Sequence, residues 1–394
     1  MKIAIVVYGR FHAFNLARAL IERGHDVRVF TTYPKWAARR FGLGPQNVCS
    51  CWPLGILERA VGRITSERRR RELEPFYVTT FGRWVAKQVG RESWDVVHEF
   101  SGVGEEAIRA TSGKTKNLLL RGSAHIRTQA AILREEASRV GVGLEGPSAW
   151  IIAREEREYA AADAIVVLSR FAFDSFRSRG VPAEKLLLLP LGVDTSAFTL
   201  PEDGVEKRCR RILSGVPLTV LTTGAVSFQK GLYDFAKIAR ALNGRFHFRW
   251  IGAVREEAKD FVERLPGCVE LVPHQPQARL AEAYAEADLF LLPTIHDGFA
   301  LVLAQAYANS LPLLTTTNCA GPDLIHEGKT GWVFPIRDPQ GFIDRLLWCD
   351  SHREELARMV REIARAFRPR NWRDVAADFE NLCSPPATAA QRSA

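Results

Sequence analysis

The chain has 394 residues, of which 46% are apolar and 25% charged, an ordinary composition for a globular protein of two or three domains. No stretch reaches the roughly 18 consecutive apolar residues of a transmembrane helix, and the short apolar run at the N-terminus does not predict a signal peptide. The net charge of +9 favours an anionic partner such as a phosphate ester, a lipid headgroup or nucleic acid.

Short apolar runs alternate with helical patterns through the first half of the sequence. A strand over 2–7, a helix near 14–23 and a second strand over 26–32 begin this pattern. Further strands are predicted over 94–100, 117–123, 164–169 and 185–190. Continuous apolar strands are typical of a parallel sheet that is covered on both faces. The first half, residues 1–198, is therefore predicted to be a Rossmann-like domain.

The same alternation restarts after a polar segment, 199–216, which predicts a linker. A second Rossmann-like domain is expected over 217–370, with strands at 218–224, 246–252, 269–274, 288–294 and 311–317. A last helix over 371–382 is expected to pack back on the first domain, and 383–394 to be a disordered tail. The fold class is α/β, with two doubly wound parallel sheets facing a central cleft where ligands bind.

A possible anion site opens the predicted helix over 299–309. Asp297 and Gly298 precede Phe299, Ala300 and Leu301, and the first amides of a helix have no partner inside it. A diphosphate suits such a site, with Gln305 in reach of a neighbouring hydroxyl. The alternative is that Gly298 serves only the turn.

A second candidate is the sequence from 222 to 242, where Gly224 follows a strand and Lys230 opens a helix. The helix dipole disfavours a cation at that end, which favours a ligand role for Lys230 as a point charge on a phosphate. The alternative is a solvated lysine.

The two motifs, in this order, resemble the retaining glycosyltransferases of the GT-B fold, in family four (glycosyl transferases group 1). The resemblance runs from TTGAVSFQKG through the DGFALVLAQAYANSLPLLTT segment to NCAGPDLIHEGKTGWVF, and more loosely over the first half. It implies a transferase that moves a sugar from a nucleoside-diphosphate sugar to a glycan, lipid-linked or small-molecule acceptor.

The family's E-x7-E motif falls on Asp297 and Gln305, so both glutamates are replaced. The resemblance implies that Asp297 contacts the donor sugar and that Gln305 binds the ribose. Lys230 matches the family's lysine, whereas Ala225 stands where many relatives have an arginine. His125 is expected to face the donor sugar as a catalytic residue, and His274 to begin the loop beside the nucleobase.

The resemblance further implies retention of anomeric configuration by front-face attack, without an enzymic nucleophile or a metal ion. Positive charge at the leaving diphosphate is then expected from the helix 299–309 and Lys230. Arg10 and Arg121 are candidates to replace the missing arginine. His12, His25 and His296 are expected to be structural or solvated.

The acceptor side is less specific. Segments 33–44 and 51–76 mix aromatic or aliphatic residues with arginines, which suits a peripheral anchor on anionic lipid. The alternative is a solvated arginine-rich helix face and a mobile loop. Nucleic acid is not expected, since no recognised binding module accompanies the charge.

Seven cysteines are scattered along the chain without zinc spacing, which favours reduced thiols and a cytoplasmic protein. Segments 33–44 and 51–76 would place it peripherally at the inner face of the membrane. Two other functions remain open: a nucleotide-sugar epimerase of the same fold, and a catalytically degenerate donor-binding protein, to which Gln305 and Ala225 point.

Overall fold

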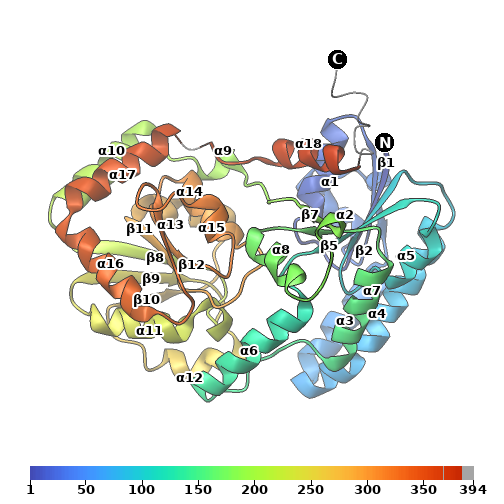
Figure 1. The fold of residues 1–394 in the computed structure, drawn as a ribbon, viewed down its shortest axis with the longest axis horizontal. Helices are drawn as coiled ribbons and strands as arrows, with labels where there is room; N and C mark the ends of the chain where they lie inside the picture. The colour runs from blue at the N-terminus through green and yellow to red at the C-terminus, as the bar shows by residue number, and fades with distance from the viewer. Residues whose placement is uncertain (367, 384–394) are drawn as a thin grey trace.

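The apolar runs form two separate parallel sheets, each covered by helices on both faces (Figure 1). The structure is a computed structural model and describes residues 1–366 and 368–383. The two lobes lie side by side, and the expected class of two doubly wound parallel sheets is confirmed. The strands of the first lobe are short, and β1 (Lys2–Val7) is buried over its last five residues.

The N-terminal sheet has seven strands in the order β3-β2-β1-β4-β5-β6-β7. Strand β1 pairs with both neighbours, Ile3 opposite Val27 and Val96. The other strands are β2 (Asp26–Thr31), β3 (Val48–Ser50), β4 (Val96–Phe100), β5 (Lys116–Arg121), β6 (Ala164–Val167) and β7 (Leu186–Leu188). The helices are α1 (Ala13–Glu22), α2 (Lys35–Ala38), α3 (Trp52–Ile64), α4 (Glu67–Val89), α5 (Glu105–Thr111), α6 (Ile126–Val140), α7 (Ala149–Ala161) and α8 (Arg170–Arg177).

The C-terminal sheet has six strands in the order β10-β9-β8-β11-β12-β13. They are β8 (Leu218–Thr223), β9 (Phe246–Ile251), β10 (Val269–Val272), β11 (Leu289–Leu292), β12 (Leu313–Thr316) and β13 (Gly331–Phe334). The helices are α9 (Thr195–Phe198), α10 (Glu202–Leu213), α11 (Leu232–Ala241), α12 (Lys259–Val262), α13 (Gln277–Glu286), α14 (Leu301–Ala308), α15 (Gly321–Leu324), α16 (Pro339–Ser351), α17 (Arg353–Ala366) and α18 (Trp372–Cys383).

Short 3-10 helices occupy several connections: η1 (Arg39–Phe41), η2 (Pro45–Asn47), η3 (Ala183–Lys185), η4 (Phe228–Lys230) and η5 (Glu256–Ala258). Strands β3 and β13 are additional to those expected from the sequence. None of the described helices has the length and apolar character needed to span a bilayer.

The expected linker over 199–216 is wrong for most of its length, because residues 202–213 form helix α10, which packs against α17. Its buried residues are Val205, Arg208, Cys209 and Ile212. They recur at helical spacing and form a core-facing stripe. The segment looks polar because the other face of the helix is charged and one residue of the buried stripe is itself an arginine.

Arg208 is completely buried, and its guanidinium donates to main-chain carbonyls at two helix ends. It reaches the oxygens of Tyr284 (2.8 Å) and Ala287 (2.8 Å) at the end of α13, and the Asn309 oxygen (2.5 Å) after α14. Carbonyls at a helix C-terminus have no partner within the helix. Arg208 therefore satisfies these carbonyls and anchors α10 to the C-terminal lobe.

The chain crosses between the lobes twice, and the two crossings touch. The Val193 amide donates to the Arg370 oxygen (2.8 Å), and a Cβ at Gly192 would lie 2.6 Å from the Asn371 carbonyl carbon. After the second crossing, α18 lies on α1 of the N-terminal lobe (Figure 1). The tail expected over 383–394 lies outside the described residues beyond Cys383, the last residue of α18.

We predict that Arg208→Leu lowers the free energy of unfolding by about 3 kcal/mol, because it removes the charged donor from the buried carbonyls of Tyr284, Ala287 and Asn309. Urea unfolding monitored by circular dichroism measures the loss. Arg210→Leu, an exposed position on the same helix, should change the value by no more than about 0.5 kcal/mol. Equal effects of the two variants would contradict the anchoring role.

Candidate functional site

A cleft of about 980 Å³ separates the lobes at the carboxyl ends of both sheets. Its walls follow directly on strands: Tyr8 after β1, Ser101 after β4, Gly122 after β5 and His274 after β10. From the C-terminal lobe it is further lined by Gln277, Asp297, Phe299, Ala300, Leu301 and Gln305. Since the carboxyl ends of parallel strands are where α/β proteins bind ligands, this cleft is the candidate site.

Asp297 caps the start of α14 with its own carboxylate. Its Oδ1 accepts from the amides of Ala300 (2.9 Å) and Phe299 (3.3 Å). Ala300 has a positive φ of 61°, which turns the chain into the helix. The amides of Leu301 and Val302 have no acceptor in the described part of the chain. Two of the amides expected to bind an anion, those of Phe299 and Ala300, are therefore already bonded to Asp297, and those of Leu301 and Val302 remain.

Lys230 forms an ion pair with Asp297 from the neighbouring connection. It ends η4, where the Ser227 hydroxyl accepts from its amide (3.3 Å), and its Nζ contacts Asp297 Oδ2. Burial by itself would raise the pKa of Asp297, but the Lys230 ammonium and the helix amides outweigh burial and hold that pKa below its usual value. The carboxylate is thus charged. Asp297 lines the cleft, whereas Lys230 is not among the described residues that line it.

The lobes touch at Gly298. Its Cα lies so close to the opposite lobe that a Cβ would come within 2.0 Å of the Gly122 oxygen. The Gly298 oxygen accepts from the Ser169 hydroxyl (2.6 Å), and Ser123 Oγ lies 3.0 Å from His296 Nε2. Gly298 is therefore required by a close approach of two backbones and not by a positive φ.

Ion pairs from helix α6 join the lobes at a second place. Both terminal nitrogens of the Arg139 guanidinium donate to the Asp234 carboxylate, Nη1 to Oδ2 at 3.0 Å and Nη2 to Oδ1. Arg337, from the C-terminal lobe, donates to the buried Glu136 (2.9 Å) and to Glu135 (3.0 Å). Asp234 is 1% exposed, so this contact is largely shielded from water. Such pairs hold the lobes in the observed orientation.

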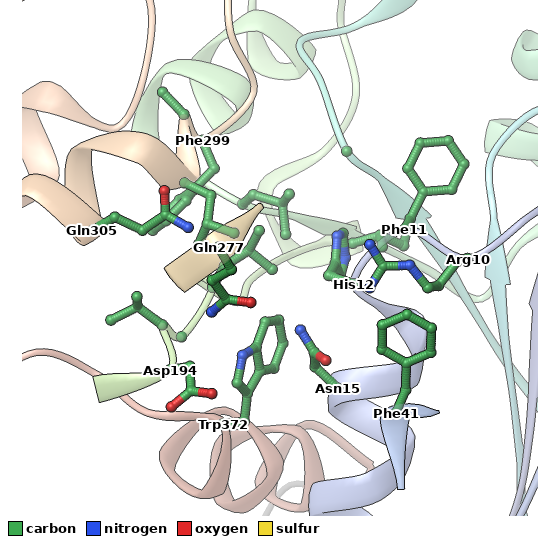
Figure 2. Close-up of a pocket in the computed structure, with 18 of the residues that line it drawn as sticks. Arg10, Phe11, His12, Asn15, Phe41, Asp194, Gln277, Phe299, Gln305 and Trp372 are labelled. Carbon is green, nitrogen blue, oxygen red and sulfur yellow. The ribbon is translucent and has the colours of Figure 1, made fainter. Parts of the chain in front are cut away.

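Gln305 lies on the cleft side of α14 (Figure 2). The Tyr284 hydroxyl donates to its Oε1 (3.3 Å) and also lies 2.7 Å from Thr223 Oγ1. Because the oxygen of the amide is engaged, its nitrogen is the atom left for the cleft. Gln305 can therefore donate a hydrogen bond to a ligand oxygen, where a glutamate would accept one.

His125, which was expected to face the donor sugar, is buried in the N-terminal lobe and is not among the described residues that line the cleft. It caps α6, its Nδ1 accepts from the Arg127 amide (3.2 Å), and its ring packs on Tyr159 and Phe176. Burial lowers the pKa of His125 to about 4, so the ring is neutral. Of the residues that follow β5, Gly122 and Ser123 line the cleft, whereas the His125 ring lies inside the N-terminal lobe.

Gly224 has a role in packing within the C-terminal lobe. Its oxygen accepts from Trp250 Nε1 (3.1 Å), and a Cβ at Gly252 would lie 1.8 Å from that oxygen. Gly224 is not among the described cleft-lining residues, whereas His274 is. Arg121, a candidate for a phosphate, is engaged with Glu155 (2.9 Å) and Gln129 (2.5 Å).

The opposite wall contains Arg10, which the sequence offered as a phosphate candidate, and Phe11, Asn15 and Phe41, which it did not single out. Figure 2 shows Arg10, His12 and Asn15 across the cleft from Gln277 and Gln305. The Arg10 guanidinium stacks on Phe41 at 4.3 Å. For Arg10, Phe11 and His12 the sequence did carry one signal, since they lie in the connection that follows β1.

The His12 ring contacts one aromatic ring at the end of β4 and another at the start of α18. It lies 5.1 Å from Phe100 and stacks on Trp372 of α18 at 6.1 Å. Burial lowers the pKa of His12 to about 3. His12 is therefore a neutral residue of the cleft wall and not a solvated one. His296 is likewise neutral, with its pKa lowered to about 4 by burial, and structural as expected.

Two family profiles match the chain: Glycosyltransferase Family 4 over residues 10–197 and Glycosyl transferases group 1 over residues 217–350. The amylovoran biosynthesis glycosyltransferase of Erwinia amylovora is 27% identical over 205 residues, 48% of each chain. The D-inositol 3-phosphate glycosyltransferase of Xylanimonas cellulosilytica is 25% identical over 93% of this chain and 88% of its own. The alignment with the first of these spans only about half of that relative.

Solved structures share the fold over nearly the whole chain. The Anabaena protein HepE in complex with UDP and glucose has a TM-score of 0.69 at 12% identity, covering 97% of this chain and 99% of its own. Sucrose-phosphate synthase from Thermosynechococcus elongatus has a TM-score of 0.70 at 18% identity, covering 97% and 98%.

We predict that Gly298→Ala keeps the lobes apart, because the added methyl group meets the Gly122 oxygen and a backbone must move. The radius of gyration from small-angle X-ray scattering should rise relative to the unaltered protein. Gly146→Ala is the control, since a Cβ there meets nothing within 4 Å. An unchanged radius in both variants would contradict the contact.

Proposed function

Because this chain belongs to the family-four, group 1 glycosyltransferases, we propose that it transfers a sugar from a nucleoside-diphosphate sugar to an acceptor in the synthesis of a polysaccharide or related glycan. The observation that carries the proposal is the Lys230–Asp297 pair beside the opening amides of α14, at the edge of an interlobe cleft. The related HepE structure binds UDP and glucose, and a relative acts in amylovoran biosynthesis.

The donor diphosphate is proposed to lie at the amides of Leu301 and Val302. The helix dipole favours an anion there, and Lys230 adds a full charge behind Asp297. Arg10 faces the same space from the opposite wall and can replace the arginine absent at Ala225. The nucleoside then extends toward His274 and Gln305, whose amide nitrogen can donate to a ribose oxygen.

The reaction proposed is a retaining transfer on one face of the sugar. The bond from the anomeric carbon to the diphosphate oxygen breaks, the bond to the acceptor oxygen forms, and the acceptor proton goes to the leaving phosphate oxygen. Asp297 is held by Lys230 and two amides, so its role is to orient the sugar and not to attack it. Helix amides and Lys230 supply the stabilising charge, and we propose that no metal ion is required.

Exposed apolar side chains support the expectation that segments 33–44 and 51–76 bind a membrane surface. Helix α3 exposes Trp52, Ile56 and Leu57 to between 47% and 50%, and Ile64 to 84%. Trp36 is 71% exposed, and the cations Arg59 and Arg63 alternate with the apolar residues of α3. We propose that this face lies on an anionic membrane, with apolar groups in the interface and arginines at the headgroups.

Donor binding is tested by Lys230→Ala. We expect the affinity for UDP-glucose, GDP-mannose or whichever sugar nucleotide raises the melting temperature to fall about 30-fold, because a charge on the diphosphate is lost. Isothermal titration calorimetry measures the affinity, and release of nucleoside diphosphate measures turnover. Lys237→Ala is the control, an exposed lysine of α11 whose ammonium lies over Tyr233.

Equal donor affinity in both variants would contradict the assignment of the site. Donor binding without transfer to any acceptor would instead favour a donor-binding protein. Formation of an epimer without acceptor would favour the epimerase.

Membrane attachment is tested by Ile56→Glu with Leu57→Glu. The double change places charge on the apolar face of α3, so partitioning to vesicles of phosphatidylglycerol and phosphatidylcholine should fall at least about tenfold in a sedimentation assay. Leu213→Glu, on the exposed side of α10, is the control. Unaltered sedimentation of the double variant would show that this face does not bind lipid.

A further inference from the structure

A second hollow, of about 440 Å³, lies in the N-terminal lobe between α3 and α4, and we refer to it as the α3–α4 groove. Its apolar wall includes Val61, Leu73, Val78, Val103 and Ile151. Tyr8, Phe11 and Ser101 line both this groove and the interlobe cleft. The two spaces are therefore continuous, and a ligand in the groove can extend to the reacting centre.

Phe11 stands where the groove meets the cleft, in a conformation that costs energy. Its φ is +43°, a region that bulky residues rarely occupy, and its side chain is 68% exposed. The ring stacks on Phe100 at 6.1 Å and leaves its other face open. Strain of this kind is retained at functional positions when the surroundings hold it. An exposed, rigidly supported ring is suited to pack on the apolar face of another ring.

The polar groups of the groove suit hydroxyl groups. Glu58, Glu74 and Glu145 line it, and carboxylate oxygens accept hydrogen bonds from hydroxyls. The Tyr8 hydroxyl is buried and has no hydrogen-bond partner of good geometry among the described residues, although Glu58 lies near it. A ligand that brings hydroxyl groups would satisfy this oxygen.

The charge of the groove argues against an anionic ligand. Arg70 and Arg71 also line it, but the three glutamates named above outnumber them. A phosphate or phospholipid headgroup would meet more negative than positive charge there. The combination of an open aromatic face, carboxylates and apolar walls instead suits a neutral carbohydrate.

We propose that the α3–α4 groove binds the sugar units of an oligosaccharide acceptor that lie behind the unit receiving the transferred sugar. Phe11 packs on the sugar at the junction, while the glutamates and Tyr8 bind hydroxyls of the units in the groove. The proposal rests on the proposed transferase function and adds that the acceptor is a glycan of two or more units.

The test compares acceptors of different length with the unaltered protein and two variants. The probes are methyl glycosides of glucose, galactose, mannose and fucose, the corresponding disaccharide glycosides, and the same monosaccharides on an undecyl chain. Val61→Trp fills the groove, and Phe11→Ala removes the platform. The controls are Val216→Trp and Leu213→Ala, exposed positions in the C-terminal lobe. Sugar-nucleotide binding by calorimetry reports that each variant is folded.

The unaltered protein should use one disaccharide with a kcat/KM about tenfold above that of its monosaccharide, the advantage of one additional aromatic contact. In Val61→Trp the ratio of the two kcat/KM values should fall to about one, while kcat/KM for the monosaccharide and the donor affinity stay unchanged. Phe11→Ala should lower kcat/KM for both lengths, and the controls should behave like the unaltered protein.

Several results would overturn the inference. One is a length preference that Val61→Trp leaves intact, and another is a preference for undecyl glycosides that Val61→Trp removes, which would assign the groove to a lipid chain. Intact donor binding with no transfer to any of these sugars would do the same. Loss of donor binding in the unaltered protein would refute the transferase function itself.

Discussion

The site depends on one close approach, where the backbone of Gly298 meets that of Gly122 across the lobe boundary. A Cβ at Gly298 would meet the Gly122 oxygen, whereas a Cβ at Gly122 would meet nothing within 4 Å, so the glycine at 298 is what lets the connections after β11 and β5 touch. This contact sets the distance between the wall that carries Asp297 and the wall that carries Arg10. The α6 ion pairs and the Ser169 hydroxyl bond act on the same boundary and fix the orientation.

The electrostatics of the site follow from Asp297. Its carboxylate pairs with the positive charge of Lys230 and accepts hydrogen bonds from two helix amides. A diphosphate would have to share Lys230 with Asp297 and rely on the amides that follow. Gln305 is a neutral amide that accepts a hydrogen bond from Tyr284, so it adds no negative charge beside the proposed phosphate site.

The sequence predicted the strands well, because a parallel sheet that is buried on both faces requires uninterrupted apolar runs such as KIAIVV. It failed at α10, where Arg208 is polar by type but buried by position, with main-chain carbonyls and the Asn309 side-chain oxygen as its partners. It also placed Asp297, Lys230 and Gln305 near one another, since the family motif carries that information. The sequence could not show that the chain after β5 turns the His125 ring onto Tyr159 and Phe176, while Gly122 and Ser123 line the cleft.

The two touching crossings, near Gly192 and Asn371, restrict how the lobes can move. They lie at one end of the lobe boundary, and helix α6 lies at the other (Figure 1). Domains joined at one point separate by rotation about it and not by translation. We expect such a rotation to displace Arg139 and Asp234 most, so that opening of the cleft would break this shielded ion pair. Part of the energy barrier to opening would then reside in residues that do not line the cleft.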